Sequence, residues 1–241
     1  MILHKLTKTN TILTLILIFI LGGCSASTDK IGSDRVHSDD IHQSYDIYYD
    51  ANTNTTDIYA TFRVGGSTGT TVELVKPGKL EMNDQDAILD NKYGAHYSLK
   101  LRSGNQQTIN IIWTTNEGTQ YKNNFNILPA AISTNFNNII SLHSNVIIDV
   151  EAANFDREKD TISLDVHQVR SDGMTNENNI GTYDSITKQI IVKSENLQNL
   201  QPGPVIFTLS RSSFRTLDQK TSKGGNAYLK YNKEFSGQVE P

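Results

Sequence analysis

The chain has 241 residues, of which 37% are hydrophobic and 20% are charged, with only 16 glycines and 5 prolines. This composition excludes a collagen-like or low-complexity chain, and the clustering of its apolar residues excludes general disorder. The formal net charge is -4, so the chain lacks the positive surface that nucleic-acid binding needs. We therefore expect one or two folded domains and no nucleic-acid partner.

Residues 1–23 have the organisation of an export signal. Two lysines precede an almost wholly apolar run at 11–21, and Gly22 and Gly23 stand before Cys24. Eleven apolar residues are too few to cross the hydrocarbon layer, which takes about 20. The segment is therefore predicted to be a signal peptide that is removed after export.

The ending Leu21-Gly22-Gly23-Cys24 resembles the lipobox of bacterial lipoproteins. The resemblance implies that the Cys24 thiol receives a diacylglyceryl group, that the chain is cut before it, and that the new amine is acylated. Several acyl chains, at ~0.8 kcal/mol per buried CH₂, make a permanent membrane anchor. In lipoproteins of bacteria with two membranes, an Asp after the lipidated cysteine favours retention in the inner membrane. Ser25 at this position therefore implies transfer to the outer membrane, and either its periplasmic face or the cell surface is compatible with the sequence.

The segment between the leader and the first apolar cluster, residues 24–43, is expected to be a lipidated flexible tether. It shows no period of 2 or 3.6 residues. His37 and His42 lie among aspartates, but a solvated linker is a simpler interpretation than a metal site. Cys24 is the only cysteine, so no internal disulfide can form and the fold must rest on its packed core.

From residue 45 onward the pattern changes to short runs of β-branched and aromatic residues separated by turn residues. In the run Asp57–Val64, apolar side chains alternate with polar ones, as in a sheet with one buried side. We expect strands at 45–50, 57–64, 70–75, 94–101, 108–114, 119–127, 145–152, 161–169, 180–184, 188–193, 204–210 and 226–232.

Pro129 divides these strands into two series, because proline cannot donate to a sheet ladder. The predicted fold is all-β, with two immunoglobulin-like β-sandwich domains in tandem at 44–129 and 130–241. If that division is correct, residues 131–241 should fold alone.

Two segments resemble known bacterial chains. Residues 197–211, LQNLQPGPVIFTLSR, are similar to a turn and strand of immunoglobulin-like repeats in bacterial envelope proteins. Residues 62–70, FRVGGSTGT, resemble a segment of uncharacterised bacterial lipoproteins. Both resemblances imply a fold and a location in the cell envelope, and neither implies an activity.

A G-x-S-x-G sequence surrounds Ser67. A nucleophile elbow needs this serine on a turn from a strand into a helix, whereas the next residues predict another strand. We expect the glycines to provide the positive φ angles of a hairpin loop, and Ser67 not to be a nucleophile.

Three other groups of polar residues resemble binding or catalytic sites, and each is predicted to be part of the solvent-exposed surface. Asp165 and His167 stand two apart on one strand face, as in a metal or acid–base pair, but an exposed polar face is the favoured explanation. The acids of residues 149–160 match no calcium loop, although Ca²⁺ binding there stays open. Arg211 and Arg215 are expected to form ion pairs with the chain's own acids.

Aromatic residues concentrate in the first half of the chain. Trp113 is expected in the core, while the adjacent Tyr48 and Tyr49 must point to opposite faces. Exposed tyrosines suit protein or sugar contacts, although polar-faced sheets also carry them. The tyrosines concerned are Tyr45, Tyr48, Tyr49, Tyr59, Tyr93, Tyr97 and Tyr121.

The sequence thus predicts a lipid-anchored, non-enzymatic binding or interaction protein of the cell envelope. It predicts no catalytic residue, metal or cofactor, and leaves the protein or glycan partner unidentified. Two alternatives stay open. One is an envelope hydrolase or carbohydrate-active enzyme with a site assembled from distant strands, and the other is a structural envelope spacer.

Overall fold

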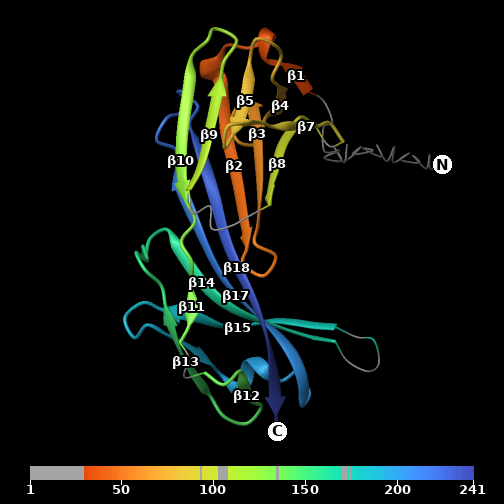
Figure 1. The fold of residues 1–241 in the computed structure, drawn as a ribbon, viewed down its shortest axis with the longest axis vertical. Coiled ribbons are helices and arrows are strands. Elements are labelled where there is room, and N and C mark those ends of the chain that lie inside the picture. The colour runs from red at the N-terminus through yellow and green to blue at the C-terminus, as the bar shows by residue number, and fades with distance from the viewer. Residues whose placement is uncertain (1–29, 93, 103–107, 134–135, 170–172, 174) are drawn as a thin grey trace, which may run out of the picture.

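The computed structural model describes residues 30–92, 94–102, 108–133, 136–169, 173 and 175–241. These residues form β-strands and three 3-10 helices, and no helix among them is long and apolar enough to cross a membrane. The strands form two bodies arranged along the long axis of the molecule (Figure 1). The predicted signal peptide and Cys24 lie outside the described residues.

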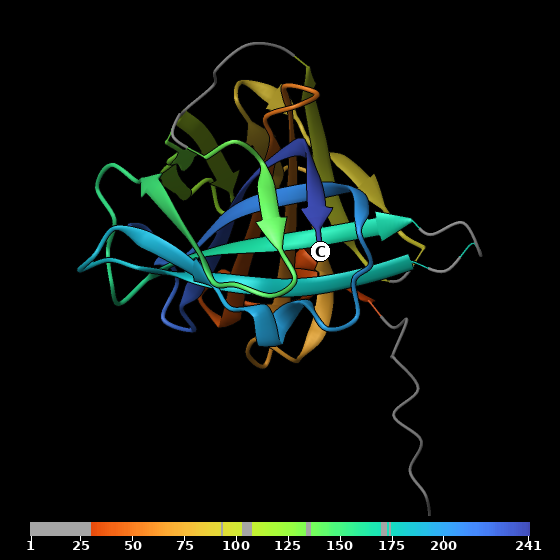
Figure 2. The ribbon, with the colours of Figure 1, turned by 90° about the horizontal axis from the view of Figure 1, so that it is seen from below.

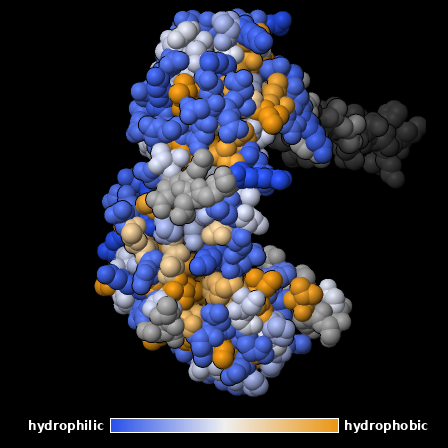
Figure 3. All heavy atoms as spheres, in the orientation of Figure 1, coloured by the Kyte–Doolittle hydropathy of each residue, from blue (hydrophilic) through white to orange (hydrophobic). Residues whose placement is uncertain are grey.

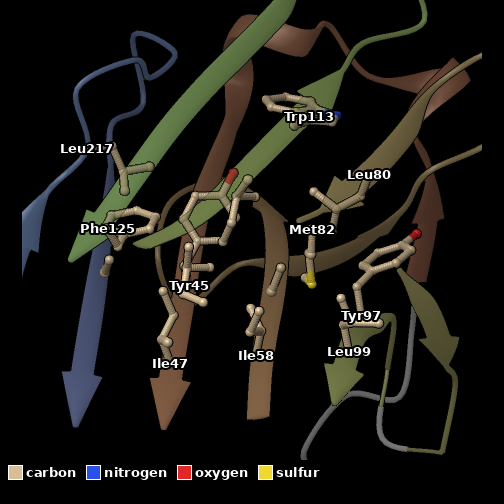
Figure 4. Close-up of a cluster of buried hydrophobic side chains, with 14 of the residues drawn as sticks. Tyr45, Ile47, Ile58, Leu80, Met82, Tyr97, Leu99, Trp113, Phe125 and Leu217 are labelled. Carbon is tan, nitrogen blue, oxygen red and sulfur yellow. The ribbon is translucent and has the colours of Figure 1, made fainter. Parts of the chain in front are cut away.

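The first body is a sandwich of two sheets. One layer is the end of a long sheet containing β1 (Lys30–Gly32), β2 (Ile41–Asp50), β3 (Thr55–Val64), β4 (Thr70–Glu73), β7 (Ile88–Asp90) and β8 (His96–Arg102). The other layer contains β5 (Lys79–Met82), β6 (Gln85–Asp86), β9 (Thr108–Thr114) and β10 (Gln120–Asn126). Aromatic and branched side chains from both layers meet in one core around Tyr45, Phe62 and Trp113. Figure 4 shows Tyr45 and Trp113 in this core.

The second body encloses a separate core. One layer contains β14 (Asp160–Val169), β15 (Thr175–Asp184), β17 (Gly203–Thr216) and β18 (Gly225–Glu240). The other contains β11 (Ala131–Ile132), β13 (Val146–Glu151) and β16 (Gln189–Val192), while β12 (Ile139–Ser141) pairs with the end of β18. In the end-on view β14 and β15 extend side by side (Figure 2).

Strands β17 and β18 form one hairpin that runs through both bodies. They pair from Gly203–Val239 to Thr216–Asn226. The first half of β18 also pairs in parallel with β2, from Gly225–Gln43 to Asn232–Asp50. The hairpin is therefore part of both sandwiches and joins them into one continuous sheet.

Three 3-10 helices complete the described secondary structure. They are η1 (Ser33–Arg35), η2 (Ser38–Asp40) and η3 (Ser194–Leu197). In the first of these, Ser33 is buried and its hydroxyl accepts a hydrogen bond from the Val75 amide at 2.8 Å. This bond fixes the start of the described chain against the end of β4.

The predicted all-β sandwich fold is confirmed, and most predicted strands appear within a few residues of their expected bounds. Period-two alternation in β3 is confirmed by the burial of Ile58, Ala60 and Phe62, and Trp113 lies in the core as predicted. Six short strands were not predicted, namely β1, β5, β6, β7, β11 and β12.

The predicted tether at 24–43 differs from the structure over residues 30–43. These form β1, η1, η2 and the start of β2, and Ile41 and Gln43 are buried. Gln43 faces inward, where it accepts a hydrogen bond from the Tyr45 hydroxyl at 3.0 Å. A polar residue at an inward position hides the period-two pattern, so this part of the strand escapes sequence analysis.

The predicted division at Pro129 also differs from the packing. Four residues of the second series, Leu217, Ala227, Leu229 and Tyr231, belong to the core of the first body. Figure 4 shows Leu217 beside Phe125 in that core. The packing leads us to expect that residues 131–241 do not fold alone.

Candidate functional site

The outward face of the long sheet is continuous across the two bodies, because β17 and β18 belong to both. Along β2 and β18 the even-numbered side chains point outward, and the odd-numbered ones fill the cores. On the face drawn in Figure 3, hydrophilic side chains cover most of the first body and hydrophobic ones gather in patches on the second.

Four aromatic side chains from four adjacent strands form a strip on this outward face. They are Tyr59 of β3, Tyr48 of β2, Tyr228 of β18 and Phe214 of β17, which we call the aromatic strip. The Tyr48 ring lies 6.0 Å from both the Tyr59 and the Tyr228 rings, at 69° and 62°. Phe214 and Tyr228 have ring centroids 4.9 Å apart. Neighbouring rings are inclined to one another rather than stacked face to face.

The aromatic strip is open to solvent at its two ends. Phe214 is 64% exposed and Tyr59 is 44% exposed, while Tyr48 and Tyr228 are half-buried between them. An exposed ring on a rigid strand offers apolar contact area with little loss of conformational entropy on binding. Such a row is therefore suited to contact a ligand that crosses the strands.

Asp46 lies within the aromatic strip. It is opposite Tyr59 on β3 and opposite Tyr228 on β18, and its side chain is half-buried. Burial raises the pKa of the Asp46 carboxyl above its usual value. Burial also raises the pKa of Tyr48, with further contributions from Asp46, Tyr228 and Tyr59.

A polar hollow lies next to the aromatic strip on the second body. Its volume is about 480 Å³, and it is lined by Asp165, Val166, His167, Asn179, Ile206, Thr208, Ser210, Lys230 and Glu234. Lys230 stands opposite Tyr48 in the β2–β18 ladder, so it borders both the hollow and the strip. Carboxylate, amide and hydroxyl groups here offer both acceptors and donors to a polar ligand.

The sequence-predicted groups take different places. Asp165 and His167 line the polar hollow, as the outward pair on β14 that the sequence suggested. Among the described residues, which include 149–160, no group of three or more His, Cys, Asp or Glu could hold a metal ion. His37 accepts a hydrogen bond from the Asp39 amide, and His42 faces outward at the start of β2.

Ser67 lies in the exposed hairpin between β3 and β4. Gly65 and Gly66 have φ angles of 87° and 105°, which confirms the predicted role of these glycines. The chain enters β4 at Thr70 without a helix, so the turn differs from a nucleophile elbow.

The predicted ion pairs of Arg211 and Arg215 are confirmed, and both arginines meet Asp160. The distances are 2.6 Å and 2.7 Å, and the Asp160 side chain is fully buried. Burial alone would raise the pKa of Asp160, but hydrogen bonds from Ser213 and Arg211 outweigh it and lower the pKa. The cluster therefore holds an ionised carboxylate inside the protein, away from the outward face.

Arg211 also connects the cluster to the junction of the two bodies. It donates to the carbonyl oxygens of Pro129, Ala153 and Asn154 at 2.9–3.1 Å. The Arg211 side chain is 2% exposed, so these hydrogen bonds form inside the protein. We assign this cluster a structural role.

Comparison with known proteins identifies no family. No protein-family model matches the chain, and no curated protein matches it. Among solved structures, fibronectin(III)-like modules of Clostridium thermocellum CbhA are similar at 12% identity, over 76% of this chain and 87% of that chain. The TM-score is 0.23, which is too low to carry a conclusion about this chain.

The sequence indicates two tyrosines of the aromatic strip, Tyr48 and Tyr59, but does not predict that they lie side by side on one surface. It missed Tyr228, Phe214 and Asp46 as parts of one surface. Tyr228 and Phe214 are 180 and 166 residues from Tyr48 in the chain and join it only through the parallel β2–β18 ladder. No local pattern indicates such a pairing.

Proposed function

We propose that this protein is a lipid-anchored, non-enzymatic binding protein of the bacterial cell envelope, and that it binds a glycan along the outward face of its long sheet. The observation that carries the proposal is the exposed aromatic strip across four strands, continuous with a polar hollow. The lipobox supports the membrane anchor, and Ser25 supports the outer membrane.

A glycan fits this face better than a folded protein does. A sugar ring has an apolar C–H face that packs on aromatic rings, and a rim of hydroxyls that pair with carboxylates and amides. The strip and hollow combine these two kinds of group. Protein interfaces instead have a continuous apolar centre from which charges are depleted, whereas Asp46 lies inside this strip.

The aromatic strip is tested with the full mature chain, purified in detergent and exposed to immobilised envelope polysaccharides. We expect Tyr48→Ala/Phe214→Ala to weaken binding at least tenfold, because each removed ring takes away a contact worth more than about 1 kcal/mol. Ile186→Ala, which removes a similarly exposed apolar side chain at a distant turn, is the matched control. Equal binding by the double variant and the parent would rule out the strip as the binding surface.

The anchor is tested by metabolic labelling with palmitate. We expect the parent chain to incorporate the label and partition with membranes, and Cys24→Ser to remain an unlabelled, uncleaved precursor. The reason is that acylation and cleavage both require the cysteine thiol in a lipobox. Label that persists in Cys24→Ser would contradict the anchor and leave the binding face untouched.

A further inference from the structure

Asp46 is a carboxylate that the rest of the described protein leaves without a partner. It makes no hydrogen bond and no ion pair with any described residue, although its side chain is half-buried. Its neighbour Asp57, one row along the same face, is paired with Lys100 at 3.2 Å. A partly buried acid without a partner lowers stability, so its presence within a binding surface points to a ligand.

The aromatic groups that flank Asp46 favour a positive charge. Tyr59 and Tyr228 flank it on the two neighbouring strands, and Tyr48 contacts both of their rings. The faces of aromatic rings attract cations, and a carboxylate adds a full negative charge. An anionic ligand would meet repulsion from the same groups.

The chain's own cations do not fill this position. Lys100 is held by Asp57, and Lys230 lies one row along β18, without an ion pair to Asp46. Other acids of the same face, Asp165 and Glu234, line the hollow beyond Lys230. The charge of the surface is thus complementary to a chain that carries spaced positive groups.

We infer that Asp46, with Tyr48, Tyr59 and Tyr228, binds the ammonium group of an amino sugar, and that the ligand is a glycan with free, unacetylated amines. This inference rests on the proposed glycan-binding function and specifies its ligand. The carboxylate pairs with the ammonium group, and the tyrosine rings surround it while contacting the sugar ring. N-acetylation would remove the charge and add bulk at the same atom.

The test compares two matched probes, a β-1,4-linked glucosamine pentamer and its fully N-acetylated form, by calorimetric titration of the full mature chain at slightly acid pH. We expect the free-amine pentamer to bind at least tenfold more tightly. Asp46→Asn is expected to remove this preference. Glu240→Gln, which removes an equal charge about 40 Å away along β18, should retain it.

Unfolding does not explain a loss of preference in Asp46→Asn. Burial raises the pKa of Asp46, so the ionised carboxylate carries a free-energy penalty in the folded protein at pH values above its ordinary pKa. Asparagine removes that penalty, so we expect equal or greater thermal stability in the variant.

Each outcome decides the inference. Equal affinity for the two pentamers overturns the inference and leaves glycan binding in place. A second outcome is that Tyr48→Ala binds neither pentamer while Asp46→Asn keeps the preference for the free-amine pentamer. That result would assign the preference to a group other than Asp46 and would also overturn the inference. A third outcome is that neither pentamer binds, that a lysine-containing peptide binds, and that Asp46→Asn abolishes the binding of this peptide. In that case both the inferred ligand class and the proposed glycan-binding function fail.

Discussion

Replacing Arg211 with methionine is expected to lower the free energy of unfolding, by at most about 3–5 kcal/mol, since the buried Asp160 carboxylate would keep Arg215 as its only paired arginine. Asp160 would lose its 2.6 Å bond from Arg211 while its side chain remains fully buried. Three carbonyl oxygens at the junction of the two bodies would also lose a donor. Urea denaturation followed by circular dichroism measures the change.

The control for this experiment is Arg157→Met, which replaces an exposed arginine in the loop before β14. Exposed substitutions of this kind usually change stability by less than about 0.5 kcal/mol. A double variant, Arg211→Met/Asp160→Leu, should recover part of the loss, because no buried charge remains in it. An Arg211→Met midpoint equal to that of the parent would mean that the cluster does not hold the junction.

The same cluster gives stability a defined dependence on pH. The folded pKa of Asp160 is lowered, so its contribution is fully present above the unfolded pKa of about 3.9 and is lost as pH falls through the folded value. The loss should be smaller in Arg211→Met, where the carboxylate has fewer donors.

Separating the chain at Pro129 is expected to prevent either part from folding alone. Residues 25–129 would lack the β18 strand that pairs with β2, and residues 131–241 would expose Leu217, Leu229 and Tyr231. Burial of one large apolar side chain is worth about 1.5–3 kcal/mol. Losing three such contributions is comparable with the whole stability of a domain, about 5–15 kcal/mol.

This expectation is measured by expressing the two parts separately and together. Each alone should show no cooperative unfolding transition, and the two together should co-purify as a one-to-one complex with the parent's far-ultraviolet spectrum. A monomeric 131–241 fragment with a sharp transition of its own would show that the second body is independent of the first. That result would restore the division suggested by the sequence.

The sequence predicted features that depend on local alternation and could not predict those that depend on distant pairing. β9 appears at its predicted residues, 108–114, because every second residue there is apolar and buried. β17 and β18 were expected at 204–210 and 226–232 but extend to Thr216 and Glu240. Their extra length carries serines, arginines, glutamates and one lysine, which local patterns assign to loops.

The candidate site shows the same limit. Tyr59 was predicted to face outward from the alternation in β3, and it does. Its place beside Tyr48, Asp46 and Tyr228 depends on the register of the β2–β3 and β2–β18 ladders. Register is set by the complete fold, so residue types alone did not reveal the surface.

The parallel ladder between β2 and β18 also fixes when the first body can be completed during synthesis. The hydrogen bond from Thr221 to the Ile41 carbonyl joins residues 180 positions apart, so the first body stays open at the β2 edge until the last strand has emerged. An open strand edge pairs readily with other chains. A premature stop anywhere before residue 225 would therefore damage the body encoded first as severely as the one encoded last, and we expect such products to aggregate or be degraded.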